Sequence, residues 1–173
     1  SGRLNEEIRV KRGLSYGAGS SYVSGRYAGS IVATTLVEHA RAPEALDIML
    51  GTISSLGGSA PASADELLVR RTSLLGGMAS GIETIGGLVR SVAANAFAGL
   101  PLDALTTGPA ALNAVEPAAV TRFASAALSA APTIVLVGDS SKFIDVVRKA
   151  HPDVLVVKAS ELDLTSPGLT RRP

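Results

Sequence analysis

The chain has 173 residues, of which 46% are hydrophobic and 18% charged, a balance typical of one globular domain with a core. Its 16 basic and 15 acidic residues leave a net charge of +1 and are spread along the chain, so no basic patch indicates nucleic-acid binding. Cys is missing, which excludes disulfides and thiolate metal sites, and no apolar run is long enough for a transmembrane segment.

The first predicted elements are a short helix and a hairpin. Residues 4–12 carry acids early and bases late, the order that the helix dipole favours, and Gly13 would end this helix. Residues 14–38 then change to Tyr, β-branched and small side chains, interrupted by turn chemistry around residues 24–26. We therefore expect a polar helix followed by two paired strands.

Helices dominate the middle of the chain. Residues 42–56 place apolar side chains at helical spacing, which predicts one face against the sheet. This face comprises Leu46, Met49, Leu50, Ile53 and Leu56. A capping box of Ser63 and Glu66 begins the next helix, with a bend near Gly81 and a further helical stretch to about Phe97. The buried face expected for the helix after Ser63 comprises Leu67, Leu68, Leu74, Leu75 and Met78.

The second half of the chain predicts two more helices and a strand-helix-strand ending. Pro101 and Pro117 each stand where the first turn of a helix accepts proline. The apolar face of the later helix comprises Val120, Phe123, Ala124, Ala127 and Leu128. Residues 133–137 and 154–157 are apolar, β-branched runs on either side of a helical stretch at 140–150, so both runs are expected to be strands.

The histidines do not form a metal-binding pattern. His39 and His151 are the only two, and neither lies at helical spacing from another candidate ligand. Residues 35–39 (TLVEH) end like the inverted zinc motif H-x-x-E-H, but Thr35 replaces its first ligand and the segment is predicted to be a strand. We interpret His39 as a loop residue and His151 as a helix-end residue favoured by the dipole.

Two glycine-containing turns raise a nucleotide-binding alternative. Residues 17–19 (GAG) begin like a dinucleotide fingerprint, but Tyr22 occupies the next required glycine position. Asp139 follows an apolar run and could mark a phosphate- or metal-binding turn or, more simply, cap the next helix. A doubly wound nucleotide or signalling domain built on residues 133–157 is the corresponding fold, and the predicted hairpin argues against it.

The most informative stretch is residues 3–17, RLNEEIRVKRGLSYG. It resembles the non-zinc-binding half-domain of the pitrilysin/insulinase family of zinc metallopeptidases (inverted zincins), including the mitochondrial processing peptidase and similar bacterial members. In that family an Arg and a Tyr seven positions apart, around a Gly-Leu-x-Tyr turn from helix to strand, reach toward the zinc centre of the other half-domain. Arg9 and Tyr16 stand at that separation.

The resemblance covers roughly residues 1–150 and implies a fold. Further matches in family order lie at residues 45–56, 65–67, 98–102, 115–123 and 135–138. The implied fold is α+β, a mixed, mostly antiparallel sheet with helices packed on one face. A family half-domain has further strand and helix upstream, so this one is expected to be N-terminally incomplete. We expect the half-domain at residues 1–160 and a C-terminal tail at 161–173.

The resemblance also implies roles. Tyr16 would be catalytic, donating a hydrogen bond to the oxyanion that forms on the scissile carbonyl. Arg9 and Tyr16 together would bind the peptide substrate, with the planar fork of Arg9 holding backbone carbonyls. The chain itself would bind no cofactor, because zinc and the general base would come from a homologous half-domain or subunit, as in a heterodimer. The isolated chain is therefore not expected to be an active peptidase, and its compartment, periplasm or cytoplasm, stays open.

Other interpretations of these residues stand beside this one. Arg9 could pair with Glu6 on the helix surface, and Tyr16 could be an ordinary strand aromatic. Family members without a zinc motif can be structural subunits, in which case both residues would be remnants. Retention of both favours the substrate-contacting role. The strand edge at residues 20–22 could also pair with an extended substrate.

Overall fold

The computed structural model describes residues 2–24 and 27–168, and its elements follow the expected α+β order. The α-helices are α1 (Arg3–Asn5), α2 (Ala42–Ser55), α3 (Ala64–Gly81), α4 (Ile85–Ala98), α5 (Ala104–Asn113), α6 (Pro117–Ala127) and α7 (Ile144–Ala150). The strands are β1 (Ala18–Ser24) and β2 (Gly29–Thr35). The shorter turns are a π-helical one, η1 (Glu6–Val10), and the 3-10 turns η2 (His39–Arg41), η3 (Ser140–Lys142) and η4 (Ala159–Glu161).

The N-terminal helix ends at a left-handed glycine, as predicted. Gly13 has φ +59, and its N–H donates to the carbonyl of Arg9 at 3.0 Å. The N–H of Leu14 donates to the carbonyl of Ile8 at 2.9 Å, and both of these side chains are buried. This apolar contact across a glycine-ended helix fixes the direction in which the chain leaves toward the hairpin.

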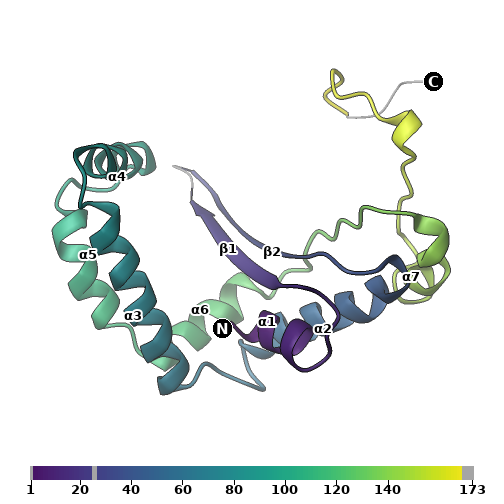
Figure 1. Ribbon diagram of the computed structural model, residues 1–173, viewed down its shortest axis with the longest axis horizontal. Coiled ribbons are helices and arrows are strands. Elements are labelled where there is room, and N and C mark those ends of the chain that lie inside the picture. Colours follow the sequence, from purple (N-terminus) through teal and green to yellow (C-terminus); the bar gives the residue numbers. More distant parts are fainter. Residues whose placement is uncertain (1, 25–26, 169–173) are drawn as a thin grey trace.

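The hairpin forms where the sequence predicts it. β1 and β2 pair antiparallel from Ala18 opposite Thr35 to Ser24 opposite Gly29, and residues 25–26 of the predicted turn lie outside the described residues. The hairpin crosses over α1 and α2 (Figure 1). The core between these elements is built on Ile8, Leu14 and Ala45.

The strand-helix-strand ending is a correction to the sequence analysis. Within the described residues the sheet contains β1 and β2 alone, so the mixed sheet is not formed there, although the α+β class is confirmed. Residues 133–137 and 154–157 lie outside every described helix and strand, and neither run joins the sheet of β1 and β2. A β-branched apolar run favours an extended backbone, yet a strand also needs a neighbouring backbone to complete its ladder.

The helices α3, α4 and α5 form a lobe at one end of the molecule (Figure 1). The capping box of Ser63 and Glu66 is present, and α3 ends at Gly81 near the expected bend. Gly87 approaches this break so closely that a Cβ there would lie 2.2 Å from the carbonyl oxygen of Gly81. The predicted buried face of this helix is wrong, because none of its five residues is buried. Leu68, Leu74 and Met78 are exposed, and Leu67 and Leu75 are half-buried.

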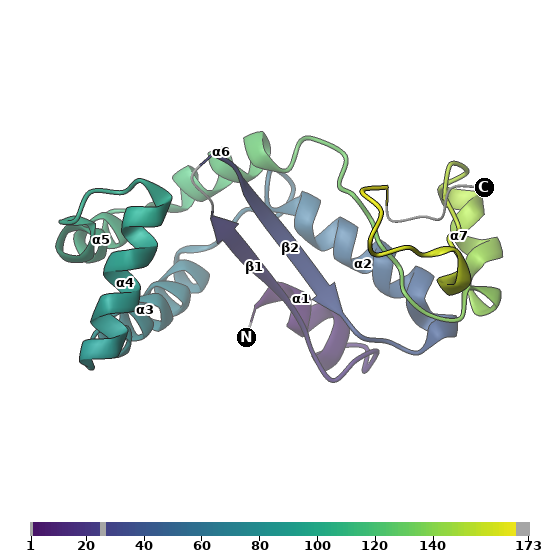
Figure 2. The same ribbon diagram turned by 90° about the horizontal axis from the view of Figure 1, so that it is seen from above.

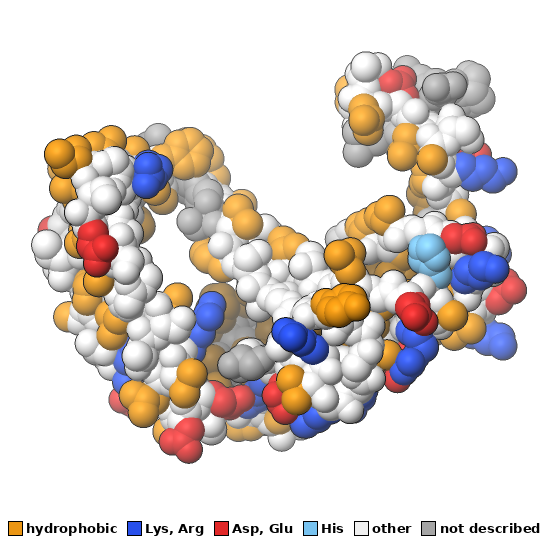
Figure 3. Space-filling model, in the orientation of Figure 1, with side chains coloured by type: hydrophobic (Ala, Val, Ile, Leu, Met, Phe, Trp, Pro, Cys, Tyr) orange, Lys and Arg blue, Asp and Glu red, His pale blue; other side chains and the backbone are white. Residues whose placement is uncertain are grey.

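The molecule exposes far more surface than a compact chain of its size. Its accessible area is 12356 Å², whereas a compact monomer of this mass exposes about 7,900 Å². Hydrophobic side chains are visible along the outer face of both ends (Figure 3). The buried hydrophobic residues of the described chain are Leu4, Ile8, Leu14, Ala45, Leu46, Ala124, Phe143 and Val147. Among the described helices, none is long and apolar enough to cross a lipid bilayer.

Candidate functional site

The turn from the N-terminal helix to β1 carries both residues that the motif singles out. Arg9 lies in the last turn of η1 with its side chain exposed. Tyr16 lies two residues before β1 and is 98% exposed. Neither side chain makes a hydrogen bond or ion pair with another residue of the described chain. Both polar ends are therefore available to a ligand.

The other basic residues of this helix have partners. Glu7 binds Lys11 at 2.6 Å through one carboxylate oxygen and Arg12 at 2.6 Å through the other. The hydrogen bonds from Lys11 and then from Arg12 lower the pKa of the Glu7 carboxyl. The alternative pairing of Arg9 with Glu6 is not formed between these described residues. Arg9 is thus left exposed to solvent, whereas Lys11 and Arg12 share the carboxylate of Glu7.

Three side chains hold the backbone of the turn that carries Tyr16 by hydrogen bonds. The hydroxyl of Ser15 accepts from the N–H of Gly17 at 3.1 Å and donates to the carbonyl of the same residue at 2.8 Å. The hydroxyl of Thr35 also donates to that carbonyl, at 3.0 Å. The side-chain oxygen of Asn5 accepts from the first N–H of β1 at 3.3 Å. The exposed phenol therefore stands on a backbone held by both the helix and β2.

A shallow hollow of about 480 Å³ opens beside Tyr16. It is lined by residues 15–19 of the turn and by residues 34–36 at the end of β2. No charged side chain lines it, and its glycines leave main chain exposed. Such a surface can receive an extended backbone while Tyr16 supplies a directed donor.

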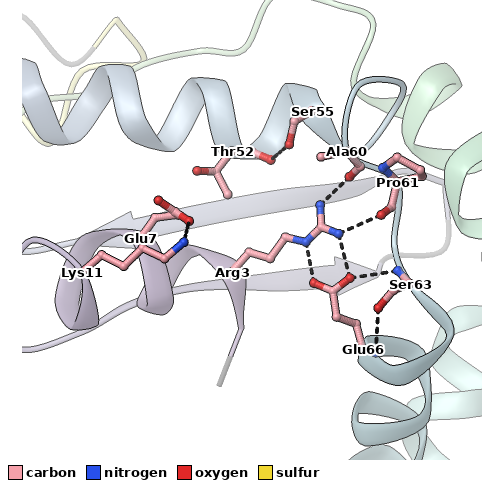
Figure 4. Close-up of polar contacts among 9 residues, drawn as sticks. All are labelled: Arg3, Glu7, Lys11, Thr52, Ser55, Ala60, Pro61, Ser63 and Glu66. Carbon is pink, nitrogen blue, oxygen red and sulfur yellow. Dashed lines mark hydrogen bonds and ion pairs between the residues drawn. The ribbon is translucent and has the colours of Figure 1, made fainter.

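An arginine outside the motif's functional pair holds the site against the helical lobe. Arg3 donates from Nε to one carboxylate oxygen of Glu66 at 2.6 Å and from Nη2 to the other at 2.7 Å (Figure 4). The same guanidinium donates to the carbonyls of Ala60 and Pro61, the latter at 2.8 Å. The hydrogen bond from Arg3 and the backbone bond at Ser63 lower the pKa of Glu66 to about 2.

Nothing in the sequence predicts this ion pair between Arg3 and Glu66, which we call the clamp. Glu66 was expected only to cap α3, and Arg3 had no role beyond its place in the motif. A sequence signal is lacking because 63 positions separate the two residues. The fork of Arg3 joins the start of α1 to the start of α3, so it sets how the motif helix sits on the rest of the chain.

The histidines lie apart from the motif. His39 packs against Gly138, where an added Cβ would lie 2.7 Å from the imidazole ring. His151 follows the last residue of α7, and its N–H donates to the carbonyl of Val147 at 2.8 Å. Within residues 2–24 and 27–168, no group of His, Cys, Asp and Glu side chains could hold a metal ion.

Asp139 acts as a cap. Its carboxylate accepts from the N–H of Ser141 at 3.1 Å and from the hydroxyl of the same residue at 2.7 Å. These hydrogen bonds lower the pKa of Asp139. Its side chain is therefore engaged at the start of η3, which is the simpler of the two interpretations.

Comparisons with solved structures identify the fold. Neither family models nor curated proteins match the sequence. A peptidase M16 inactive domain from Pseudomonas fluorescens superimposes with TM-score 0.64 at 21% identity over 72% of this chain. The inactive peptidase domain of a protein assigned as a zinc protease in Bordetella parapertussis gives 0.63 at 20% over 73%. A protein assigned as a zinc protease in Bordetella pertussis gives 0.59 at 18% over 73%.

These matches show that the chain shares the fold of structures described as inactive peptidase domains, as the resemblance led us to expect. The chain spans 29% of the length of the Pseudomonas structure. It spans 68% of each of the two Bordetella structures.

Proposed function

We propose that this chain is the substrate-contacting, non-zinc-binding part of a zinc metalloendopeptidase that acts on unfolded peptides. The observation that carries the proposal is that Arg9, in the last turn of η1, and Tyr16, on the turn that follows it, are both exposed. Neither side chain makes a hydrogen bond or ion pair with another residue of the described chain. The half-domain fold, shared with chains described as inactive peptidase domains, supports it.

Tyr16 stabilises the oxyanion. As the scissile carbonyl becomes tetrahedral, its oxygen gains negative charge, and the phenol O–H donates a hydrogen bond that strengthens with that charge. The hydroxyls of Ser15 and Thr35 both donate to the carbonyl of Gly17, so the backbone next to Tyr16 is held and the region that the phenol can reach is limited. The loss of one such donor typically costs about a hundredfold or more in kcat.

Arg9 positions the substrate. Its guanidinium presents several donors in a plane, which suits carbonyl oxygens of an extended peptide and fixes its register. Because Glu7 already binds Lys11 and Arg12, the charge of Arg9 is not neutralised within its own helix. Arg9 contacts the peptide in the bound complex as well as in the transition state. The loss of this contact should therefore mainly raise KM and leave kcat nearly unchanged.

A second half-domain or subunit supplies the rest of the machinery. When bound there, zinc would activate a water and polarise the scissile carbonyl. The accessible area of this chain exceeds that of a compact monomer by about 4,500 Å². Obligate interfaces bury about 2,000–5,000 Å² or more in total, of which about half lies on each partner, so the excess of this chain is large enough to hold such an interface. The unusual exposure of hydrophobic side chains supports such a partner.

The test pairs this chain with its zinc-bearing partner and measures cleavage of unfolded peptides with and without a chelator. Tyr16→Phe should lower kcat about a hundredfold with little change in KM. Arg9→Ala should raise KM about tenfold or more, and Arg9→Lys should recover only part of that loss. Chelation should abolish cleavage by every variant.

Matched controls separate a substrate role from general damage. Tyr22→Phe removes another exposed tyrosine hydroxyl from the same hairpin, and Arg70→Ala removes an exposed arginine from α3. Both should cleave like the parent. If Tyr16→Phe and Arg9→Ala also stay within about a factor of two of the parent kcat/KM, the substrate-site proposal is wrong. Chelator-sensitive cleavage that needs the chain but neither residue would instead indicate a structural subunit.

A further inference from the structure

The hollow beside Tyr16 opens on the face of the hairpin that the core does not cover. Its lining comes from the turn, the start of β1 and the end of β2. Gly19 and Thr34 lie opposite one another in the ladder and face away from the side of Ala18, which packs on the core. Seen from above, no described helix or strand crosses in front of this hairpin (Figure 2). A ligand can therefore reach the hollow and Tyr16 from the same side.

The polar side chains that line the hollow are engaged in the turn. The hydroxyls of Ser15 and Thr35 both donate to the carbonyl of Gly17, at 2.8 and 3.0 Å. Because no charged side chain lines the hollow, a charged group that enters it would lose hydration without gaining a counter-charge. The hollow is therefore suited to an uncharged group.

Leu36 supplies the apolar surface of the hollow. It follows the last residue of β2, and its side chain is 88% exposed. A single exposed leucine is ordinary on a protein surface, but Leu36 lines the same hollow as Tyr16. An apolar group placed there would cover the Leu36 side chain and remove both surfaces from water, which is favourable.

Gly19 keeps part of the hollow empty. A Cβ added at this residue meets no atom within 4 Å, and its backbone is not in the left-handed region. Neither a turn nor packing within the described chain therefore requires a glycine here, and a residue with a side chain would suit a strand better. The volume of about 480 Å³ lies within the range of ligand pockets, about 300–1,000 Å³.

We propose that this hollow is a subsite for an apolar side chain of the substrate, that of the residue before the scissile bond. The inference rests on the proposed function, because Tyr16 as the oxyanion donor brings the substrate to the hollow. The carbonyl that Tyr16 binds belongs to the residue before the scissile bond, so the side chain of this residue is attached next to the bound group. Leucine, methionine or phenylalanine at this position fills the hollow, whereas lysine or glutamate does not.

The test uses the chain with its zinc-bearing partner and peptides that differ only in the residue before the scissile bond, with the cleaved bond identified by mass spectrometry. The parent should cleave the leucine peptide with a kcat/KM at least about tenfold above that of the lysine or glutamate peptide. Leu36→Glu should favour the lysine over the glutamate peptide, and Leu36→Lys should reverse that preference, each by about tenfold. Because Leu36 is exposed and lies outside β2, both variants should fold.

A change of size tests the same hollow without a charge. Gly19→Val fills the empty space and should lower cleavage of the leucine peptide at least about tenfold, while a peptide with alanine at this position stays within about a factor of two. Val32→Glu is the matched control, because it places a charge on the same face of β2 as Leu36 but outside the hollow. It should leave every ratio between peptides within about a factor of two.

The outcomes distinguish this subsite from the proposed function. Tyr16→Phe should slow all peptides by the same factor and leave their ratios unchanged. If Tyr16→Phe slows cleavage but the ratios ignore Leu36 and Gly19, the subsite is wrong and the proposed function stands. Ratios that instead follow the residue after the scissile bond would also overturn the subsite.

A binding measurement decides the subsite even if no peptide is cleaved. Capped tripeptides with leucine or lysine between two alanines are added to the 173-residue chain and followed by amide NMR. The leucine peptide alone should shift the amides of residues 15–19 and 34–36 at concentrations up to about 10 mM. Equal shifts with both peptides, or none with either, would overturn the subsite.

Discussion

Replacing Glu66 by glutamine tests the clamp that joins the motif helix to α3. Glutamine retains the capping geometry at Ser63 but loses the charge that Arg3 binds through two oxygens. The pKa of Glu66 is about 2 in the folded chain, against an ordinary value of 4.5. For a fully buried pair, this difference would correspond to about 3.4 kcal/mol of stabilisation.

The actual magnitude is smaller because water reaches both side chains. Arg3 and Glu66 are 26% and 43% exposed, so the attraction is screened. We therefore expect Glu66→Gln to lose about 1 kcal/mol at neutral pH. For a chain of this length, that loss lowers the unfolding temperature by roughly 2–4 °C.

The pH dependence gives the sharper result. Because the folded pKa lies below the unfolded one, the ionised Glu66 contributes its stability fully above pH 4.5 and loses it as the pH falls toward about 2. Thermal unfolding of parent and Glu66→Gln should therefore differ at pH 7 and converge near pH 2. Glu44→Gln, which breaks the exposed pair with Arg41, should shift the midpoint less. A difference between parent and Glu66→Gln that stays constant from pH 7 to pH 2 would refute the reasoning.

Three further substitutions test the turn and the helical lobe. Gly13→Ala meets no atoms but must adopt φ +59, so it should cost about 1–2 kcal/mol in thermal unfolding; an unchanged midpoint would show that the helix ends differently. Gly87→Ala places a Cβ 2.2 Å from the carbonyl oxygen of Gly81 and should cost about 1–3 kcal/mol, measured by urea unfolding; stabilisation would contradict the close approach. Thr35→Val removes one tether of the Tyr16 turn and should lower kcat about threefold to tenfold at unchanged KM in the peptidase assay. An effect on KM alone would argue against a positioning role.

Features that depend on contacts between residues close in the sequence could be predicted from the sequence alone. The end of the first helix at Gly13 and the capping box of Ser63 and Glu66 each depend on contacts within a few positions. The spacing of Arg9 and Tyr16 is likewise local. The structure adds that both side chains are exposed. Spacing alone could not show whether Arg9 pairs with Glu6, and in the structure the salt bridges of this helix join Glu7 to Lys11 and Arg12 instead.

Predictions that depend on how one helix or strand packs against another were wrong at two places. Residues 133–137 have the apolar, β-branched composition of a strand, but composition cannot say whether another backbone lies within hydrogen-bonding distance. Leu68 has the spacing of a buried residue, yet spacing does not say how many elements cover a helix. Both errors come from inferring packing from periodicity.

The sequence by itself determined the α+β class, the order of the helices and the spacing of Arg9 and Tyr16 on which the family resemblance rests. These follow from periodicity, turn chemistry and residue spacing, which act over short stretches of chain. Only the tertiary structure decided that Arg3 clamps Glu66 across 63 positions, and that β2 and residues 132–137 face each other across α2. Such contacts join distant segments, and their free energy depends on geometry that no single stretch of sequence contains.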